Sequence, residues 1–172
     1  MPVLQEKPRF TRFPVVSLAA EYLVMGHLMR RNILAYKAPP NNEGYDIICI
    51  HPNPRKKVKP IRIQVKSRLA SDSDRGFPVK KGSFKAFDYV VVVFLNIGFF
   101  FDKAKRNACR TGARDPEFYT FPLAFIKKHH DDTTSWEKVL MRGLNIEQYK
   151  NEDGFEQIAR ALHVPYPEKK KE

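Results

Sequence analysis

One run of apolar residues constrains the fold of this chain more than any other feature. Residues 89–95 are all hydrophobic, and four of the seven are valine. Such a run is typical of a strand that is buried on both faces, as in parallel or mixed sheets. The preceding segment, 68–87, is polar and basic, and it is long enough for the crossover that a parallel neighbour requires. The sequence therefore predicts an α/β domain with a central mixed sheet.

Further strands and helices are expected around that strand. Apolar residues at helical spacing predict a first helix over 17–31, with Ser17 as its N-cap. An apolar strand over 45–50, covered on both faces, and an alternating strand over 61–66 follow. The remaining expected elements are strands at 33–36, 99–102 and 118–121 and helices at 122–130, 135–141 and 153–162. This gives the order α-β-β-β-α-β, with extra C-terminal strands and helices. The helical signal of the crossover itself is poor, because Gly76, Pro78 and Gly82 interrupt it.

The size and charge of the chain narrow the possible partners. Its 172 residues carry 31 Lys and Arg against 19 Asp and Glu, a formal net charge of +12. The length predicts a single domain over 1–165, followed by a basic disordered tail over 166–172. A basic surface attracts polyanions, of which nucleic acid is the commonest. Solvated surface lysines without a partner are the alternative explanation of the same charge.

The location of the protein is also constrained. The longest apolar run has seven residues, whereas a membrane-spanning helix needs about 20. The charged, proline-bearing start, 1–13, does not resemble a signal peptide. The two cysteines have no metal-binding spacing. We therefore expect a cytoplasmic protein that does not contact a membrane.

A carboxylate and a lysine on neighbouring strands suggest chemistry. Asp46 interrupts an otherwise apolar strand, and Lys66 ends the alternating strand on the same face as Gln64. A charge on a core strand is costly unless it is paired or binds a cation. Metal-assisted hydrolysis of a phosphodiester needs a hard carboxylate, a second oxygen ligand and a cation that orients water. The alternative is a simple ion pair between Asp46 and Lys66.

The order of these residues resembles the PD-(D/E)xK nuclease superfamily in its QxK variant, which includes small uncharacterised nucleases and Holliday-junction resolvases. The resemblance rests on Glu21, on residues 44–48 (Gly-Tyr-Asp-Ile-Ile) and on residues 63–67 (Ile-Gln-Val-Lys-Ser), and it covers about half of the chain. It implies a restriction-endonuclease-like core and a cofactor, Mg²⁺ or Mn²⁺. Asp46, Gln64, the carbonyl of Val65 and Glu21 would bind the metal, and Lys66 would position the attacking water.

Two residues depart from that pattern. Tyr45 replaces the proline before the aspartate, a common variation. Gln64 replaces an acid, and a neutral amide is a weaker ligand for a hard cation. Glu21 would then carry much of the negative charge of the site. If it points elsewhere, one carboxylate remains, and the domain would bind DNA without cutting it.

The leading hypothesis is therefore a Mg²⁺-dependent endodeoxyribonuclease that acts on double-stranded or branched DNA, with a homodimer as a possible assembly. Five basic residues near the strand of Lys66 are the candidate phosphate contacts: Arg62, Arg68, Lys80, Lys81 and Lys85. One alternative is a catalytically inactive protein of the same fold that binds nucleic acid through its basic face. The other is a module that binds a protein partner.

Overall fold

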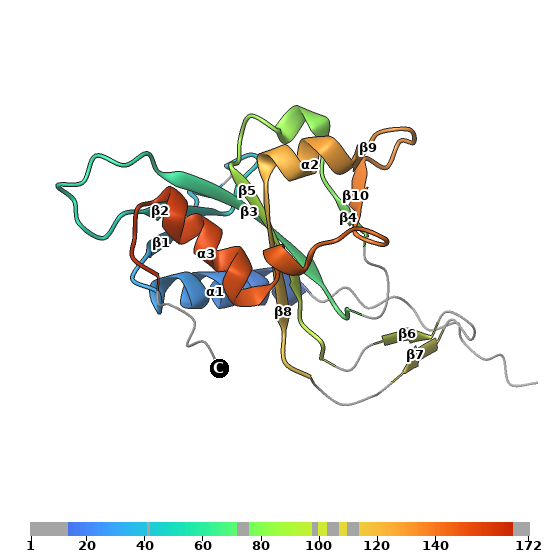
Figure 1. Cartoon of the computed structure of the whole chain (residues 1–172). Helices are drawn as coiled ribbons and strands as arrows, with labels where there is room; N and C mark the ends of the chain where they lie inside the picture. Colours follow the sequence, from blue (N-terminus) through green and yellow to red (C-terminus); the bar gives the residue numbers. More distant parts are fainter. Residues whose placement is uncertain are drawn as a thin grey trace, which may run out of the picture.

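The computed structural model describes residues 14–40, 42–71, 76–97, 100–102, 107–109 and 114–166 of the chain. Its centre is a five-stranded sheet with the strand order β1-β2-β3-β5-β8 (Figure 1). The strands are β1 (Leu34–Lys37), β2 (Ile47–Ile50), β3 (Ile61–Arg68), β5 (Tyr89–Phe94) and β8 (Glu117–Pro122). Only β3 and β5 pair in parallel, and the other three pairs are antiparallel. The expected α/β architecture with a central mixed sheet is confirmed.

Two helices cover one face of this sheet, α1 (Pro14–Met29) and α3 (Asn151–Ala161) (Figure 1). Their buried residues, such as Val24 and Ile158, pack with Ile63 of β3 and Val91 of β5 in one hydrophobic core. The side chains of a strand alternate between the two faces, so odd-numbered residues of β3 and β5 supply this core. Even-numbered residues of both strands lie on the opposite face.

A second core fills the opposite face. It is built on Val90 and Val92 of β5, on the short helix α2 (Leu123–His129) and on a separate small sheet. That sheet has the order β4-β10-β9, with β4 (Gly76–Pro78), β9 (His130–Asp131) and β10 (Lys138–Leu140). Two 3₁₀ turns, η1 (Lys81–Ser83) and η2 (Glu147–Tyr149), complete the described core. A two-stranded ribbon joins β6 (Phe100–Asp102) to β7 (Asn107–Cys109).

The crossover from β3 to β5 contains strand β4 and the turn η1, and no α-helix occurs in its described residues. Glycines at 76 and 82 and a proline at 78 disfavour a continuous helix there. The backbone of β4 instead finds its hydrogen-bond partners in β10, with Phe77 opposite Val139. This pairing matters for the site, because it holds the crossover beside Gln64 and Lys66 of β3, with which it lines a cavity.

Three local predictions were wrong. Residues 135–141 were expected to form a helix, but 138–140 are the strand β10, since pairing with β4 outweighs local helical preference. Strand β2 is not covered on both faces, because its burial alternates along the strand. Ser17 is not an N-cap, because α1 begins at Pro14 and the Ser17 hydroxyl lies 3.4 Å from that of Ser67.

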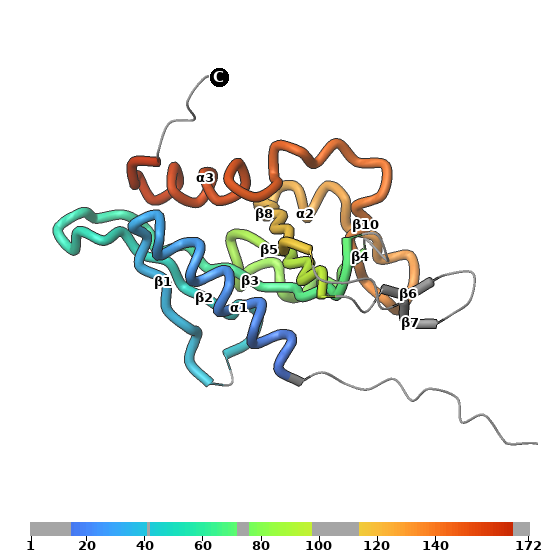
Figure 2. Tube along the Cα trace, turned by 90° about the horizontal axis from the view of Figure 1, so that it is seen from below, coloured from blue at the N-terminus to red at the C-terminus, as the bar shows by residue number. Residues whose placement is uncertain are grey.

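The remaining predicted elements lie close to their expected positions. The loop over 51–60 joins the antiparallel strands β2 and β3 and projects from one end of the molecule (Figures 1 and 2). Most of the predicted basic tail, residues 167–172, lies outside the described residues. Among the helices that the structure describes, none combines the length and the apolar character needed to cross a membrane.

Candidate active site

A cavity of about 680 Å³ opens beside β3, on the face of the sheet opposite α1 and α3. Three segments form its walls: the turn before β2, strand β3 and the crossover to β5. The lining residues are Glu43, Gly44, Gln64, Lys66, Pro78, Lys80, Gly82, Ser83 and Ala86. Gln64 and Lys66 share this cavity because residues two apart on a strand project from the same face.

Gln64 is held from one side only. Its Nε2 donates a hydrogen bond to the carbonyl oxygen of Gly44, 3.2 Å away. Its Oε1 is buried and accepts no hydrogen bond from any residue that the structure describes. A buried acceptor without a partner costs about 1–3 kcal/mol. This oxygen therefore has an unused lone pair, which either a hydrogen-bond donor or a hard cation would satisfy.

Asp46 is fixed directly against the same stretch of β3. Its Oδ2 accepts a hydrogen bond of 2.6 Å from the backbone N–H of Val65, and its own N–H donates to Ile63. The N–H and C=O of a strand residue point to the same side, so the carbonyl of Val65 also faces the side of Asp46. Asp46 itself is not one of the cavity-lining residues, but its carboxylate contacts the backbone of Val65, which lies between Gln64 and Lys66 along the strand.

Lys66 is half-buried. Burial lowers the pKa of its ammonium below the usual value, the carboxylate of Asp46 partly opposes this shift, and Arg68 adds to it. A lysine with a lowered pKa gives up a proton more readily than an exposed one. The expected proximity of the Asp46 and Lys66 charges is thus present in the structure.

Glu21, the expected helix acid, lies elsewhere. Its carboxylate forms an ion pair with Lys37, at the end of the edge strand β1. It does not line the cavity, and α1 covers the face of the sheet opposite Gln64 and Lys66. The structure therefore brings Asp46, Gln64, Val65 and Lys66 together, and it leaves Glu21 with a different partner.

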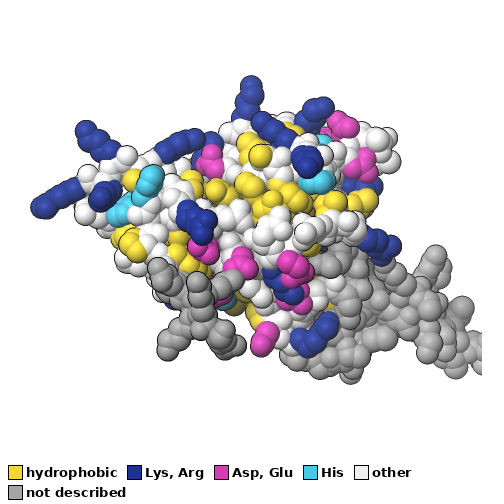
Figure 3. Space-filling model, viewed as in Figure 1, with side chains coloured by type: hydrophobic (Ala, Val, Ile, Leu, Met, Phe, Trp, Pro, Cys, Tyr) yellow, Lys and Arg dark blue, Asp and Glu magenta, His cyan; other side chains and the backbone are white. Residues whose placement is uncertain are grey.

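The five basic candidates divide into two groups. Lys80 lines the cavity, and the side chain of Lys85 is exposed. The other three are engaged within the protein: Arg62 pairs with Asp88 at 3.2 Å, Arg68 donates to the carbonyl of Gly76, and Lys81 pairs with Asp132 at 3.0 Å. Lysine and arginine side chains also mark the rim of the molecule and the projecting loop over 51–60 (Figure 3).

Sequence reasoning missed Glu43, which lines the cavity beside Gln64 and Lys66. The feature of the sequence that could have indicated Glu43 is its position three residues before Asp46, in a turn that contains a glycine. Gly44 has a φ of +94°, and a Cβ at this position would lie 2.3 Å from the Cβ of Ala86. Only glycine allows the turn before β2 to approach the crossover so closely, and this approach places Glu43 at the cavity.

The donor set can be compared with what a metal needs. Hard divalent cations prefer oxygen ligands, and Asp46, Gln64 and the carbonyl of Val65 all offer oxygen atoms. The unpartnered Oε1 of Gln64 fits such an ion. Within the described part of the chain, no three His, Cys, Asp or Glu side chains gather into a metal-binding group, so carboxylates alone do not build the site.

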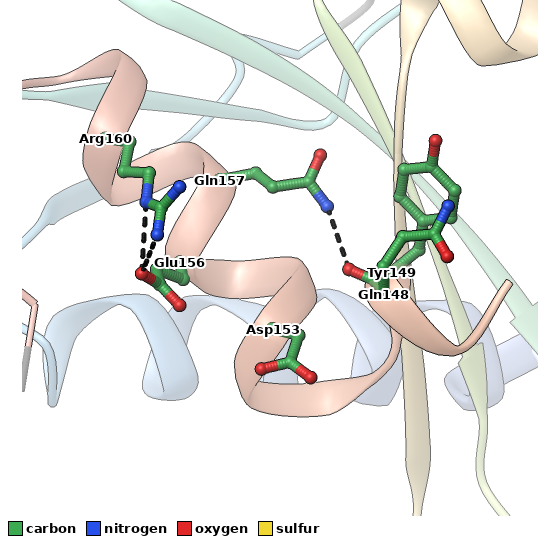
Figure 4. Close-up of a pocket in the computed structure, with 6 residues that line it drawn as sticks. All are labelled: Gln148, Tyr149, Asp153, Glu156, Gln157 and Arg160. Atoms are coloured by element: carbon green, nitrogen blue, oxygen red, sulfur yellow. Dashed lines mark hydrogen bonds and ion pairs between the residues drawn. The ribbon is translucent and has the colours of Figure 1, made fainter. Parts of the chain in front are cut away.

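A second hollow, of about 400 Å³, lies beside α3 and η2. Arg160 pairs there with Glu156, and Gln157 donates to the carbonyl of Gln148 (Figure 4). None of its lining residues has a buried polar atom without a partner. Arg160 and Gln157 are thus engaged with other residues of this hollow, and we place the site at the cavity beside β3.

Comparisons with known proteins gave matches in structure only. No protein-family model matches the sequence, and no curated protein matches it. The bacterial homing endonuclease I-Ssp6803I is similar in structure, with 14% identity and a TM-score of 0.47, over 88% of this chain and 92% of that chain. The Holliday junction resolvase Hjc of Archaeoglobus fulgidus is similar with 13% identity and a TM-score of 0.48, over 88% and 98% respectively.

Proposed function

We propose that this protein is a metal-dependent nuclease that hydrolyses DNA phosphodiester bonds at the cavity beside β3. The observation that carries the proposal is the buried, unpartnered Oε1 of Gln64, within a cavity shared with Lys66 and bordered by Asp46. A protein that only needed a stable sheet would gain by replacing Gln64 with an apolar residue. Retaining an unsatisfied acceptor beside a carboxylate and a half-buried ammonium suits a site that receives a cation and an anion.

Each residue has a chemical role in this proposal. Asp46, Gln64 and the carbonyl of Val65 would hold Mg²⁺ or Mn²⁺ through oxygen. When bound, the ion neutralises charge that develops on the phosphate in the transition state. Lys66 lies in the same cavity, where its ammonium would donate a hydrogen bond to the attacking water and so orient it. The role predicted for Glu21 stays a prediction, since its carboxylate is paired with Lys37.

DNA is the proposed substrate because of the charge of the chain and the basic side chains at the cavity. Lys80 lines the cavity and Lys85 is exposed nearby on the crossover, so both ammonium groups are available to a phosphate backbone. The net charge of +12 would strengthen the encounter with any polyanion. Double-stranded or branched DNA, cleavage by a homodimer and a cytoplasmic location remain parts of the proposal.

The test compares Asp46→Asn with the wild type on supercoiled plasmid and on branched DNA, with Mg²⁺ or Mn²⁺. The substitution keeps the shape of the side chain and an oxygen that accepts from Val65, but it removes the charge. We expect the rate of cleavage to fall at least 100-fold, while Asp115→Asn, at an exposed position outside the cavity, cleaves like the wild type. Equal cleavage by wild type and Asp46→Asn would refute the proposal.

The second candidate function is nucleic-acid binding without hydrolysis. It is favoured by one observation: the expected helix acid Glu21 is paired with Lys37, so a carboxylate that the resemblance requires is not at the cavity. In that case the wild type would bind DNA with a strong dependence on salt but would cleave none of the substrates with any divalent metal.

A further inference from the structure

If the candidate site is built only from the predicted residues, it has little negative charge with which to bind a divalent cation. Gln64 is neutral, and Glu21 lies on the helix that covers the other face of the sheet, with its carboxylate on Lys37. Asp46 would then be the single carboxylate for a doubly charged ion. In sites of phosphate chemistry, Mg²⁺ is usually bound through one or two carboxylates together with substrate phosphates and waters. A second acid at the cavity would raise the affinity of such a site.

Glu43 is at that position. It lines the cavity together with Gln64 and Lys66, and its side chain is exposed to solvent. It forms no hydrogen bond or ion pair with any residue that the structure describes, in contrast to Glu21. Its carboxylate is therefore free to bind a ligand without breaking an existing interaction.

The backbone around Glu43 is held in place on both sides. The Asn42 side chain donates to the carbonyl of Tyr45 at 3.0 Å, and the carbonyl of Gly44 accepts from Gln64. Gly44 also packs against Ala86 of the crossover at a distance that excludes a side chain. The hydrogen bond from Gln64 ties the residue next to Glu43 to the same amide whose Oε1 lacks a partner. This arrangement places Glu43 and Gln64 in the wall of one cavity.

We propose that Glu43, and not Glu21, supplies the second carboxylate that binds the divalent cation together with Asp46 and Gln64. The inference rests on the proposed function, since it assigns a ligand to the same metal. It makes the turn over 43–46 the source of both acids, three residues apart.

The experiment measures metal binding directly, so that it does not depend on cleavage. Mn²⁺ is titrated by calorimetry, with the electron paramagnetic resonance of free Mn²⁺ as a second readout, into the wild type and four variants: Glu43→Gln, Glu21→Gln, Asp46→Asn and Glu147→Gln. Glu147 is an exposed acid on η2 and serves as the matched control. Circular dichroism shows whether each variant is folded.

We expect Asp46→Asn to abolish binding and Glu43→Gln to weaken it at least tenfold. Glu21→Gln and Glu147→Gln should stay within twofold of the wild type. If Asp46→Asn abolishes binding but Glu43→Gln does not weaken it, the inference fails and the proposed function survives. A loss in Glu21→Gln alone would assign the ligand to the helix. If the wild type binds no Mn²⁺, the metal-dependent function fails together with this inference.

Discussion

At the scale of single residues, the cavity beside β3 combines groups that reduce stability with groups that suit chemistry. Gln64 keeps a buried oxygen without a partner, and Lys66 keeps an ammonium in a place where burial lowers its pKa. Both arrangements cost free energy in the folded state. Such costs are commonly retained at functional sites, where a substrate or an ion relieves them.

The lowered pKa of Lys66 predicts that the free energy of unfolding depends on pH. Because the pKa of Lys66 is lower in the folded state than in the unfolded state, the unfolded state binds more protons between the two values, and stability rises with pH across that window. Lys66→Met removes this ionisation. We therefore expect Lys66→Met to be more stable than the wild type at pH 7, with the gap closing as the pH approaches the ordinary lysine pKa of about 10.4.

Urea denaturation of the wild type and of Lys66→Met, at pH 7 and near pH 10, measures the difference in the free energy of unfolding between them. A chelator is present to remove divalent metal ions. Lys80→Met is the control, since its ammonium is on the cavity rim and exposed to solvent. A Lys66→Met variant whose difference from the wild type stays constant with pH would contradict the prediction.

At the scale of elements, the site depends on how closely the crossover approaches the turn before β2. The crossover contributes five of the lining residues, and the small sheet β4-β10-β9 holds it in place through pairs such as Phe77 with Val139. The approach itself occurs at Gly44 and Ala86. The cavity therefore exists only while these two elements stay in contact.

We expect Gly44→Ala to separate these two elements. A Cβ there would lie 2.3 Å from that of Ala86, and the φ of +94° is strained for any residue with a side chain. Overpacking and strain of this kind cost about 1–3 kcal/mol each. The loss in the free energy of unfolding should exceed that of Gly143→Ala, where φ is +77° but a Cβ would meet no atom within 4 Å.

Denaturant unfolding of the two variants separates the two effects. The Gly143 variant reports the backbone strain alone, and the Gly44 variant reports strain together with the clash against Ala86. Equal losses in both variants would mean that the turn before β2 has room to move away from the crossover.

At the scale of the whole molecule, the Lys and Arg side chains differ in whether they form ion pairs within the protein. Several cations are engaged within the protein, as in the pairs of Arg62 with Asp88 and Lys81 with Asp132. Others, including Lys80 and the loop residues Arg55, Lys56 and Lys57, are exposed and form no ion pair with any described residue, whereas Lys59 of that loop pairs with Asp88 at 3.6 Å. That loop projects from one end of the molecule (Figure 2). The unpaired cations can contact DNA phosphates, and so release counterions, without giving up an ion pair within the protein.

This distinction predicts how binding to DNA depends on salt. Lys80→Ala should weaken binding and reduce the slope of log K against log salt by about 1, since one phosphate contact is lost. Lys57→Ala, on the projecting loop, is the matched control and should leave the slope unchanged if the DNA lies across the cavity. Fluorescence anisotropy with a labelled duplex from 50 to 300 mM salt measures both. The opposite result would place the DNA on the loop.

Local patterns in the sequence were sufficient to predict much of the molecule. The valine-rich run predicted the buried strand β5, and alternation predicted that Gln64 and Lys66 share a face of β3. These features depend on the period of a strand and on the burial of side chains, both of which are local properties of the chain. The predicted helix over 153–162 also corresponds to α3, whose apolar residues recur at helical spacing.

Other features depend on contacts between segments that are distant in the sequence, and only the tertiary structure decides them. Residues 138–140 form a strand because β4, about 60 residues earlier, offers them backbone partners. Glu21 is paired because β1 brings Lys37 to it, and Glu43 lines the cavity because Ala86 lies against Gly44. The sequence by itself thus determined the sheet and the strand that carries Gln64 and Lys66. Which acid accompanies them was decided by tertiary packing, because periodicity carries no information about which distant segments meet.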